Sequence, residues 1–435
     1  MKYYRRKRTI LALGIALFTA TSLSAQEGMS LEEAIGRALE HNISLRRQEL
    51  AVKGAKRSAD TAWNTLYPAL TTNIGSSLAN KEGSNWSLSA GFNASLTLSP
   101  AIVDGIKAAR LAWEAGTISL DRARRDIERA IRKLWYQLIT LDEQLSVLAS
   151  SEANAKLSLE RTQAKQAAGL ASEIDLLNAR IMAENARVKL ESAKSSRELA
   201  LARFRDLIGL DAGDRTAFAL GGLDAPAEGE TVELPPLETI TTPTLKSLYK
   251  SIESAKTARD LSFKQSFLPR LSLSWNWAPA TSLVDGVDLL NADSWNDTGR
   301  FSVSIGMSLD PLIPGSAARM SLAKSDDSLA DLALQVESEQ QALALTVQQL
   351  LDSITDKKAT LAALEATADL AQRSYELTGE AYRRGTRDLL ALESAEQSLR
   401  EARLQVINQR RSILEDLLDL EYSCGLPFGS LGGRQ

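Results

Sequence analysis

The chain has 435 residues, of which 44% are hydrophobic and 24% are charged, and its formal net charge is -4 at pH 7. A length of this order predicts roughly two to three domains, and an acidic balance argues against nucleic acid as a partner. His41 is the only histidine and Cys424 the only cysteine. An intrachain disulfide and a metal site built from His and Cys are therefore excluded, and no cofactor is expected.

A secretory signal peptide is predicted over residues 1–25. Five basic residues precede an apolar run that ends at Phe18, and small residues follow up to Ala25. Removing this segment changes the formal charge from -4 to -9, because it carries five positive charges and no negative ones. No later segment reaches the roughly 18 to 20 apolar residues of a membrane helix, so entry into a membrane is expected through strands.

The rest of the chain is predicted to be an internal duplication of one structural unit. The first repeat, 26–235, is expected to contain a helix over 30–67, strands over 69–79 and 86–98, and a helical hairpin over 101–208. Ser30 followed by Glu33 forms a capping box at the start of the first helix. The second repeat, 236–435, is expected to contain a helix over 244–267, strands over 270–278 and 300–309, and a helical hairpin over 316–421.

Paired glycines and prolines support the duplication. Gly385 follows Gly169 by the same interval as Gly425 follows Gly209. Gly169 and Gly385 are predicted to turn the two hairpins. Pro68 and Pro269 stand where a helix gives way to a strand in each repeat, and the interval between them is shorter than that between the glycines. The second repeat therefore carries about fifteen additional residues, which are expected in a loop over 280–299.

The long helices carry a coiled-coil pattern. Apolar residues of the first repeat alternate steps of four and three, at Ile127, Ile131, Leu134, Leu138, Leu141, Leu145 and Leu148. The same register recurs at the glycine interval in the second repeat with one polar member, at Leu343, Val347, Leu350, Ile354, Lys357, Leu361 and Leu364. Uninterrupted helices of this length would reach about 80 to 100 Å, which is too long for the interior of a compact globule.

The predicted strands alternate apolar residues with Ser, Thr, Asn or Gly. Their length, about ten to thirteen residues, is close to what a tilted strand needs to cross a bilayer, and charges are expected in the turns, such as the one at 81–85. Aromatic residues stand near the strand ends, at Tyr67, Phe267, Trp275, Trp277 and Trp295. Four strands cannot close a membrane barrel, since the smallest common ones have about eight, so several chains are expected to combine.

The ordered, doubled set of elements resembles the TolC-like outer membrane efflux protein family. Leu31-Glu32-Glu33-Ala34-Ile35, the glycine turns, and Pro100 and Pro311 where a strand meets a long helix are similar to that family's motifs. The resemblance implies a mainly α fold with β: a homotrimeric α-helical barrel with a shared transmembrane β-barrel, four strands per chain. It further implies a passive exit duct in the outer membrane of a diderm bacterium, with its helical tunnel in the periplasm.

The resemblance also implies partners and a gate. An inner membrane transporter and a periplasmic adaptor would work with the duct, as a tripartite efflux pump or a type I secretion system, and outer membrane lipid would surround the strands. Asp175, Tyr382 and Arg387 match the positions of a polar network that closes the family's tunnel at the hairpin turns. Ala391 and Ser394 stand where well-studied members carry aspartate rings, so weak block by multivalent cations is expected.

Two other functions each account for part of the pattern. A secreted periplasmic coiled-coil scaffold would explain the heptads but not the paired alternating strands. An envelope hydrolase would need a nucleophile with its base, or paired carboxylates in a pocket, whereas the acidic residues fall on helix faces where solvation is the ordinary state. The chain is therefore predicted not to be an enzyme, and the scaffold remains the alternative.

Overall fold

The computed structural model describes residues 28–78, 86–211, 213–224, 234, 236, 240, 242–283, 288–289, 291–296 and 299–431. The predicted signal peptide over 1–25 and the predicted turn at 81–85 lie outside these residues. Most of the described residues are helical, and none of the helices they form is long and apolar enough to cross a membrane.

The chain forms two compact units, each of which takes segments from both predicted repeats. The first unit comprises Met1–Arg46, Ala123–Ile240 and Leu345–Gln435, and the second comprises Arg47–Arg122 and Thr241–Ala344. Helices α3 (Ala101–Ala167) and α6 (Ala317–Arg383) contribute to both units. The units therefore cut across the repeats instead of coinciding with them.

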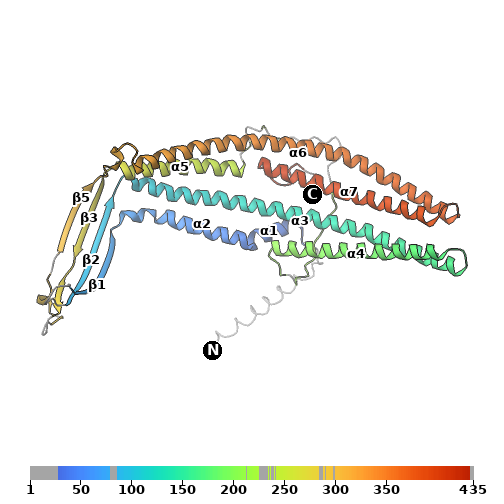
Figure 1. Cartoon of the computed structure of the whole chain (residues 1–435), viewed down its shortest axis with the longest axis horizontal. Helices are drawn as coiled ribbons and strands as arrows, with labels where there is room; N and C mark the ends of the chain where they lie inside the picture. Colours follow the sequence, from blue (N-terminus) through green and yellow to red (C-terminus); the bar gives the residue numbers. More distant parts are fainter. Residues whose placement is uncertain are drawn as a thin grey trace, which may run out of the picture. The chain divides into compact units, whose positions relative to one another are not determined.

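An antiparallel sheet lies in the second unit (Figure 1). Its strands are β1 (Ala69–Leu78), β2 (Trp86–Leu98), β3 (Arg270–Trp277), β4 (Ala280–Leu283) and β5 (Gly299–Gly306). The order of the main strands is β1-β2-β3-β5, and β4 pairs with β2. The prediction of four strands was incomplete, because the short β4 lies in the stretch 280–299 that was predicted as a loop.

The register of the sheet separates two faces. Ile74 lies opposite Ala90, Phe92 opposite Trp277, and Leu273 opposite Val303, so these apolar residues share one face. The other face carries small polar residues, and there the Ser274 and Ser302 hydroxyls lie 2.7 Å apart. The expectation that charges stay in the turns was wrong for Arg270 and Arg300, which lie at the starts of β3 and β5 on the polar face.

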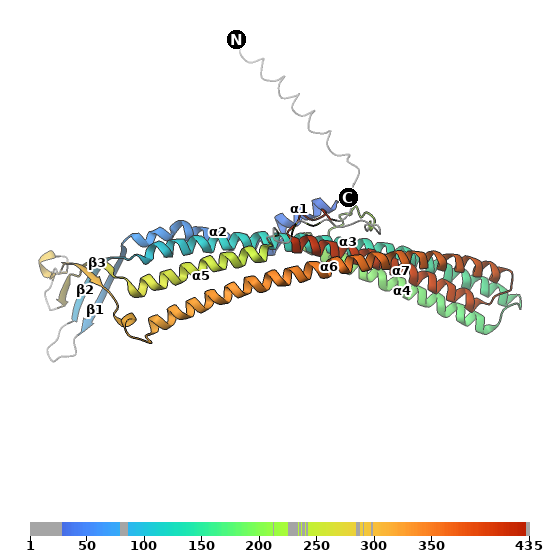
Figure 2. The same cartoon turned by 90° about the horizontal axis from the view of Figure 1, so that it is seen from above.

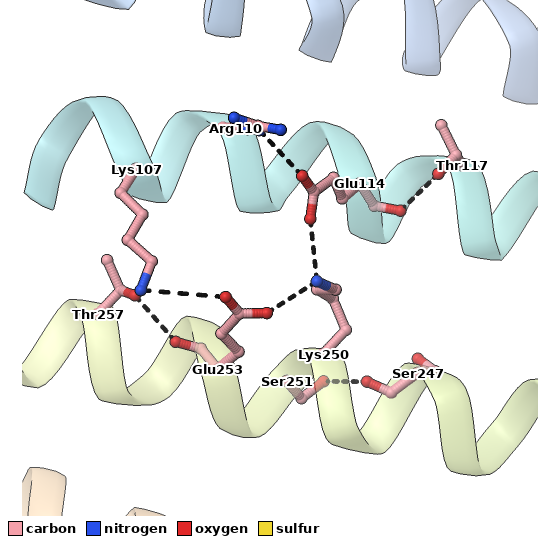
Figure 3. Close-up of polar contacts among 9 residues, drawn as sticks. All are labelled: Lys107, Arg110, Glu114, Thr117, Ser247, Lys250, Ser251, Glu253 and Thr257. Carbon is pink, nitrogen blue, oxygen red and sulfur yellow. Dashed lines mark hydrogen bonds and ion pairs between the residues drawn. The ribbon is translucent and has the colours of Figure 1, made fainter.

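Charged side chains join the helices of the second unit. Lys250 of α5 (Pro243–Phe267) donates to Glu114 of α3 at 2.9 Å and to Glu253 at 2.8 Å, as Figure 3 shows. Lys264 pairs with Asp104 at 2.7 Å further along the same two helices. The Lys250 ammonium holds the pKa of Glu114 below its usual value of 4.5. These contacts fix the rotation of α5 against α3, where few apolar side chains are buried.

The first unit is built on two helical hairpins (Figures 1 and 2). One joins α3 to α4 (Glu173–Leu207), and the other joins α6 to α7 (Leu389–Cys424). Members of the predicted seams are buried here at intervals of seven, at Ile131, Leu138, Val347, Ile354 and Leu361. The polar interruption at Lys357 is compensated, because its ammonium donates to Asp416 of α7 at 2.6 Å.

The single helix predicted over 30–67 is divided. α1 (Leu31–His41) ends at Asn42, α2 covers Ile43–Thr61, and a 3-10 helix covers Ala62–Leu66. The Asn42 carboxamide oxygen accepts from the N–H groups of Ser44 and Leu45, while its NH₂ donates to the Leu207 carbonyl at 3.1 Å. Asn42 thus starts the second helix from its own side chain and ties that point to the end of α4.

The segment after α7 is held by a buried carboxylate. Glu421 is 1% exposed, and its oxygens accept from the N–H groups of Gly429 at 2.9 Å and Leu431 at 2.7 Å. Arg125 of α3 donates to the carbonyls of Gly425 and Leu426 in the same segment. The segment from Gly425 to Leu431 is therefore fastened to the rest of the first unit by charge-assisted hydrogen bonds.

Candidate functional site at the hairpin turns

The two hairpins of the first unit turn in the same way. Gly169 and Gly385 both take positive φ, 72° and 75°. In the first turn Leu170 N–H donates to the Lys165 carbonyl at 2.8 Å, and in the second Thr386 N–H donates to the Ala381 carbonyl at 3.0 Å. This bond closes the last helical turn over a left-handed residue, which explains why glycine stands at both positions.

The helices that leave the turns begin at matched caps. Ser172 caps α4 and Asp388 caps α7, each at the third position after its turn glycine. The Asp388 carboxylate accepts from the Ala391 N–H at 3.0 Å, whereas Ser172 shares a capping box with Asp175. The first cap therefore already uses one of the predicted gate residues.

The structure places all three predicted gate residues in these two turns but does not join them within the chain. The Asp175 carboxylate accepts from the Ser172 N–H at 3.0 Å and from its hydroxyl at 2.7 Å, and these bonds lower the Asp175 pKa. Tyr382 is in the last turn of α6, with the Lys165 ammonium 4.2 Å from its ring centroid. Arg387 is exposed. Among the described residues no hydrogen bond or ion pair connects Asp175, Tyr382 and Arg387.

A small cavity of about 70 Å³ lies between the helices next to the turns. Its polar lining comes from α3, α6 and α7, and consists of Asn154, Ser158, Arg161, Tyr375, Tyr382, Glu393 and Glu396. The Glu396 carboxylate accepts from the Ser151 hydroxyl at 2.8 Å. Glu393 Oε1 is fully buried and accepts no hydrogen bond from the described residues.

The surroundings of Glu393 disfavour its charged form. Burial is the largest cause, and the carboxylates of Glu396, Asp175 and Asp388 add to it, so that the Glu393 pKa rises to about 7. The sequence places Glu393 eight residues after the turn glycine Gly385 but does not show which way its side chain points, because a glutamate on a helix normally faces solvent. Its helical position relative to Leu389 and Leu392 was visible, but the identity of the opposing side chains was not.

The four predicted transition prolines all lie at joints of the second unit. Pro68 and Pro269 directly precede β1 and β3, and Pro100 directly precedes α3. Pro311 lies in a 3-10 turn, Asp310–Leu312, between β5 and α6. Proline has no N–H to donate to a strand ladder or to the preceding helix, so each of these positions ends one element before another begins.

Comparison with known proteins identifies the class of this fold. The model of the outer membrane efflux protein family matches residues 34–210 and 240–426, one stretch in each predicted repeat. The chain therefore belongs to the outer membrane efflux protein family, and it is an outer membrane protein. No curated protein gives a significant sequence match.

Solved structures show the same fold at low sequence identity. The Campylobacter jejuni CmeC outer membrane channel matches with TM-score 0.75 and 17% identity over 91% of this chain and 85% of that one. The open state of the Neisseria gonorrhoeae MtrE outer membrane channel gives 0.74 and 19%, over 92% and 91%. VceC from Vibrio cholerae gives 0.72 and 17%, over 92% and 96%. CmeC and MtrE are outer membrane channels, and the fold is that of TolC-like proteins with a helical barrel and a β-barrel.

Proposed function

We propose that this protein is the passive exit duct of a tripartite efflux pump or type I secretion system, and that three copies form it. The observation that carries the proposal is the sheet. Its outer strands β1 and β5 are exposed along their whole length, and apolar residues on one face stand open, with Ile74 80% and Ile305 77% exposed. A soluble monomer rarely leaves such an apolar face and two unpaired edges uncovered.

A shared barrel satisfies both features of the sheet. Edge pairing between chains would use the free N–H and C=O groups of β1 and β5, and lipid would cover the apolar face. Four main strands from each of three chains make twelve, which is within the range of membrane barrels. The small, mostly uncharged side chains of the other face would then line a water-filled interior. The alternative of a periplasmic scaffold gives this sheet no role.

A passive duct takes its driving energy from a partner. An inner membrane transporter would supply that energy, coupled by a periplasmic adaptor that contacts the helices. Fractionation tests the proposal: a heat-modifiable trimer in the outer membrane is expected. Cross-linking in cells should capture the transporter. A soluble periplasmic monomer would contradict the proposal.

Asp175, Tyr382 and Arg387 are proposed to close the duct between neighbouring chains. Arg387 is exposed, and Asp175 keeps acceptor capacity beyond its bonds to Ser172, so a guanidinium of the next chain could reach that carboxylate. Such pairs hold reversibly, because exposed ion pairs are weak and are screened by salt.

Planar bilayer recordings test the gate. The combined variant Asp175→Ala, Tyr382→Phe and Arg387→Ala should raise single-channel conductance or open probability, because the bonds between chains are lost. Arg384→Ala is the matched control, since this exposed arginine of the same turn pairs locally with Glu380 at 3.4 Å. Unchanged conductance in the combined variant would reject the three residues as the gate while leaving the duct itself in place.

A further inference from the structure

The cavity beside the hairpin turns is closed by helices from both hairpins. α7 contributes the carboxyl groups of Glu393 and Glu396, and α6 contributes the phenols of Tyr375 and Tyr382. α4 contributes Ala179 and Met182, both apolar, and α3 adds polar side chains including Arg161. Any change in the charge of the cavity therefore acts on the contact between the two hairpins.

Glu393 is the member of this cavity whose charge is least compensated. Its Oε1 atom is buried without a hydrogen-bond donor among the described residues, whereas Glu396 accepts from Ser151 and has Arg400 close by. The titratable and charged groups around Glu393 are, by element, Arg161 of α3, Asp175 of α4, Tyr375 and Tyr382 of α6, Asp388 at the cap of α7, and Glu396 of α7. Three of these six are carboxylates that oppose its ionisation.

The duplication shows that the hairpin itself does not need an acid here. Counted from the turn glycine, the first-repeat position equivalent to Glu393 is Leu177, and the position equivalent to Glu396 is Arg180. Both α4 and α7 begin at a side-chain cap the same distance from the turn glycine. The helix can thus be built with leucine at this position, and the carboxyl group of the second repeat needs a different explanation.

We propose that Glu393 is a proton-operated lock on the turn end of the two hairpins. With the carboxyl group protonated, α7 packs against α4 around the cavity and the ends of the hairpins stay together. When the proton leaves, a partly buried carboxylate with one oxygen shielded from water is repelled by Asp175 of α4, and repulsion with desolvation drives α7 away from α4. This inference rests on the proposed function, because it names what regulates the opening of the same turn end.

The direction of the pH effect, and the pH range in which it occurs, follow from the surroundings of the Glu393 carboxyl group. An acid whose pKa is raised in the closed state binds its proton there more tightly than in an open, solvated state, so loss of the proton favours opening. With a pKa of about 7, Glu393 passes from roughly one tenth ionised at pH 6 to roughly nine tenths at pH 8. Opening is therefore expected to increase as pH rises through neutrality.

Planar bilayer recordings from pH 5.5 to 8.5 test the lock on the full trimer. Native open probability should rise about fivefold to tenfold between pH 6 and 8. Glu393→Gln, which keeps the shape of the protonated acid, and Glu393→Leu, which copies the first repeat, should both stay at the low-pH level throughout. Glu173→Gln is the matched control: Glu173 is exposed in the first turn of α4, so its removal deletes one negative charge nearby and should leave the native profile unchanged.

Hydrogen exchange provides a readout that does not depend on conduction. In detergent-solubilised trimer, amides of residues 385–396 should lose about tenfold protection between pH 6 and 8 after correction for intrinsic rates, and Glu393→Gln should abolish that loss. The proposal is overturned if neither the open probability nor the amide protection of the native protein changes with pH. It is also overturned if the pH dependence persists in Glu393→Gln. If no variant conducts, including the combined gate variant, the proposed duct function is wrong. Hydrogen exchange then still decides whether ionisation of Glu393 loosens the hairpins.

Discussion

Removal of the Glu421 carboxylate should release the chain segment that follows α7. The side chain is 1% exposed and accepts from the N–H groups of Gly429 and Leu431 at 2.9 and 2.7 Å. A hydrogen bond to a charged group contributes about 1.5 to 3 kcal/mol, so loss of both bonds in Glu421→Ala should weaken the closed state of this segment by about 3 to 6 kcal/mol. Glu421→Gln keeps an acceptor for one amide only and should cost about half as much.

Amide hydrogen exchange measured by mass spectrometry tests this prediction directly. Since about 1.4 kcal/mol corresponds to tenfold, the Gly429 and Leu431 amides should exchange roughly 10²- to 10⁴-fold faster in Glu421→Ala. Glu401→Ala on the same helix is the control: Glu401 is exposed and accepts from the nearby Gln397 side chain at 2.8 Å, and its loss should change these rates less than about threefold. An increase below threefold in Glu421→Ala would refute the role given to the carboxylate.

Two further predictions concern the turns and the charged contacts of the second unit. Gly385→Ala should destabilise the protein by about 1 kcal/mol because φ is 75°, whereas Gly379→Ala, inside α6 and with ordinary space for a Cβ, should be neutral or stabilising in the same denaturant titration. Equal effects would contradict the backbone argument. Because Lys250 depresses the pKa of Glu114, that contribution is present above pH 4.5 and is lost as pH falls through the lowered value. Lys250→Met should therefore reduce thermal stability at pH 6 and progressively less as the pH falls through that lowered value; a loss that does not change with pH would point to packing instead.

The local pattern of apolar and polar residues predicted much of the fold. Alternation across Leu271, Leu273 and Trp275 predicted a strand, and the observed register puts those three residues on one face. The heptad through Ile131 and Leu138 predicted a buried seam, and both residues are fully buried. These predictions succeeded because the period of the side chains, two or three and a half residues, is a property of neighbours along the chain. The break at Asn42 was missed, since neither Gly nor Pro marks it and its carboxamide reaches Leu207, 165 residues away.

By itself, the amino-acid sequence determined the order of the long helices and of the four main strands, the duplication at a constant interval through both hairpins, the turn glycines and the family. The tertiary structure alone decided which distant groups meet. In the folded chain Glu393 points into a cavity between the two hairpins, and Lys357 pairs with Asp416. The Glu421 carboxylate accepts hydrogen bonds from amides of the segment that follows α7. Burial and charge at these positions depend on side chains from other elements, and no local period in the sequence encodes which residue will stand opposite another.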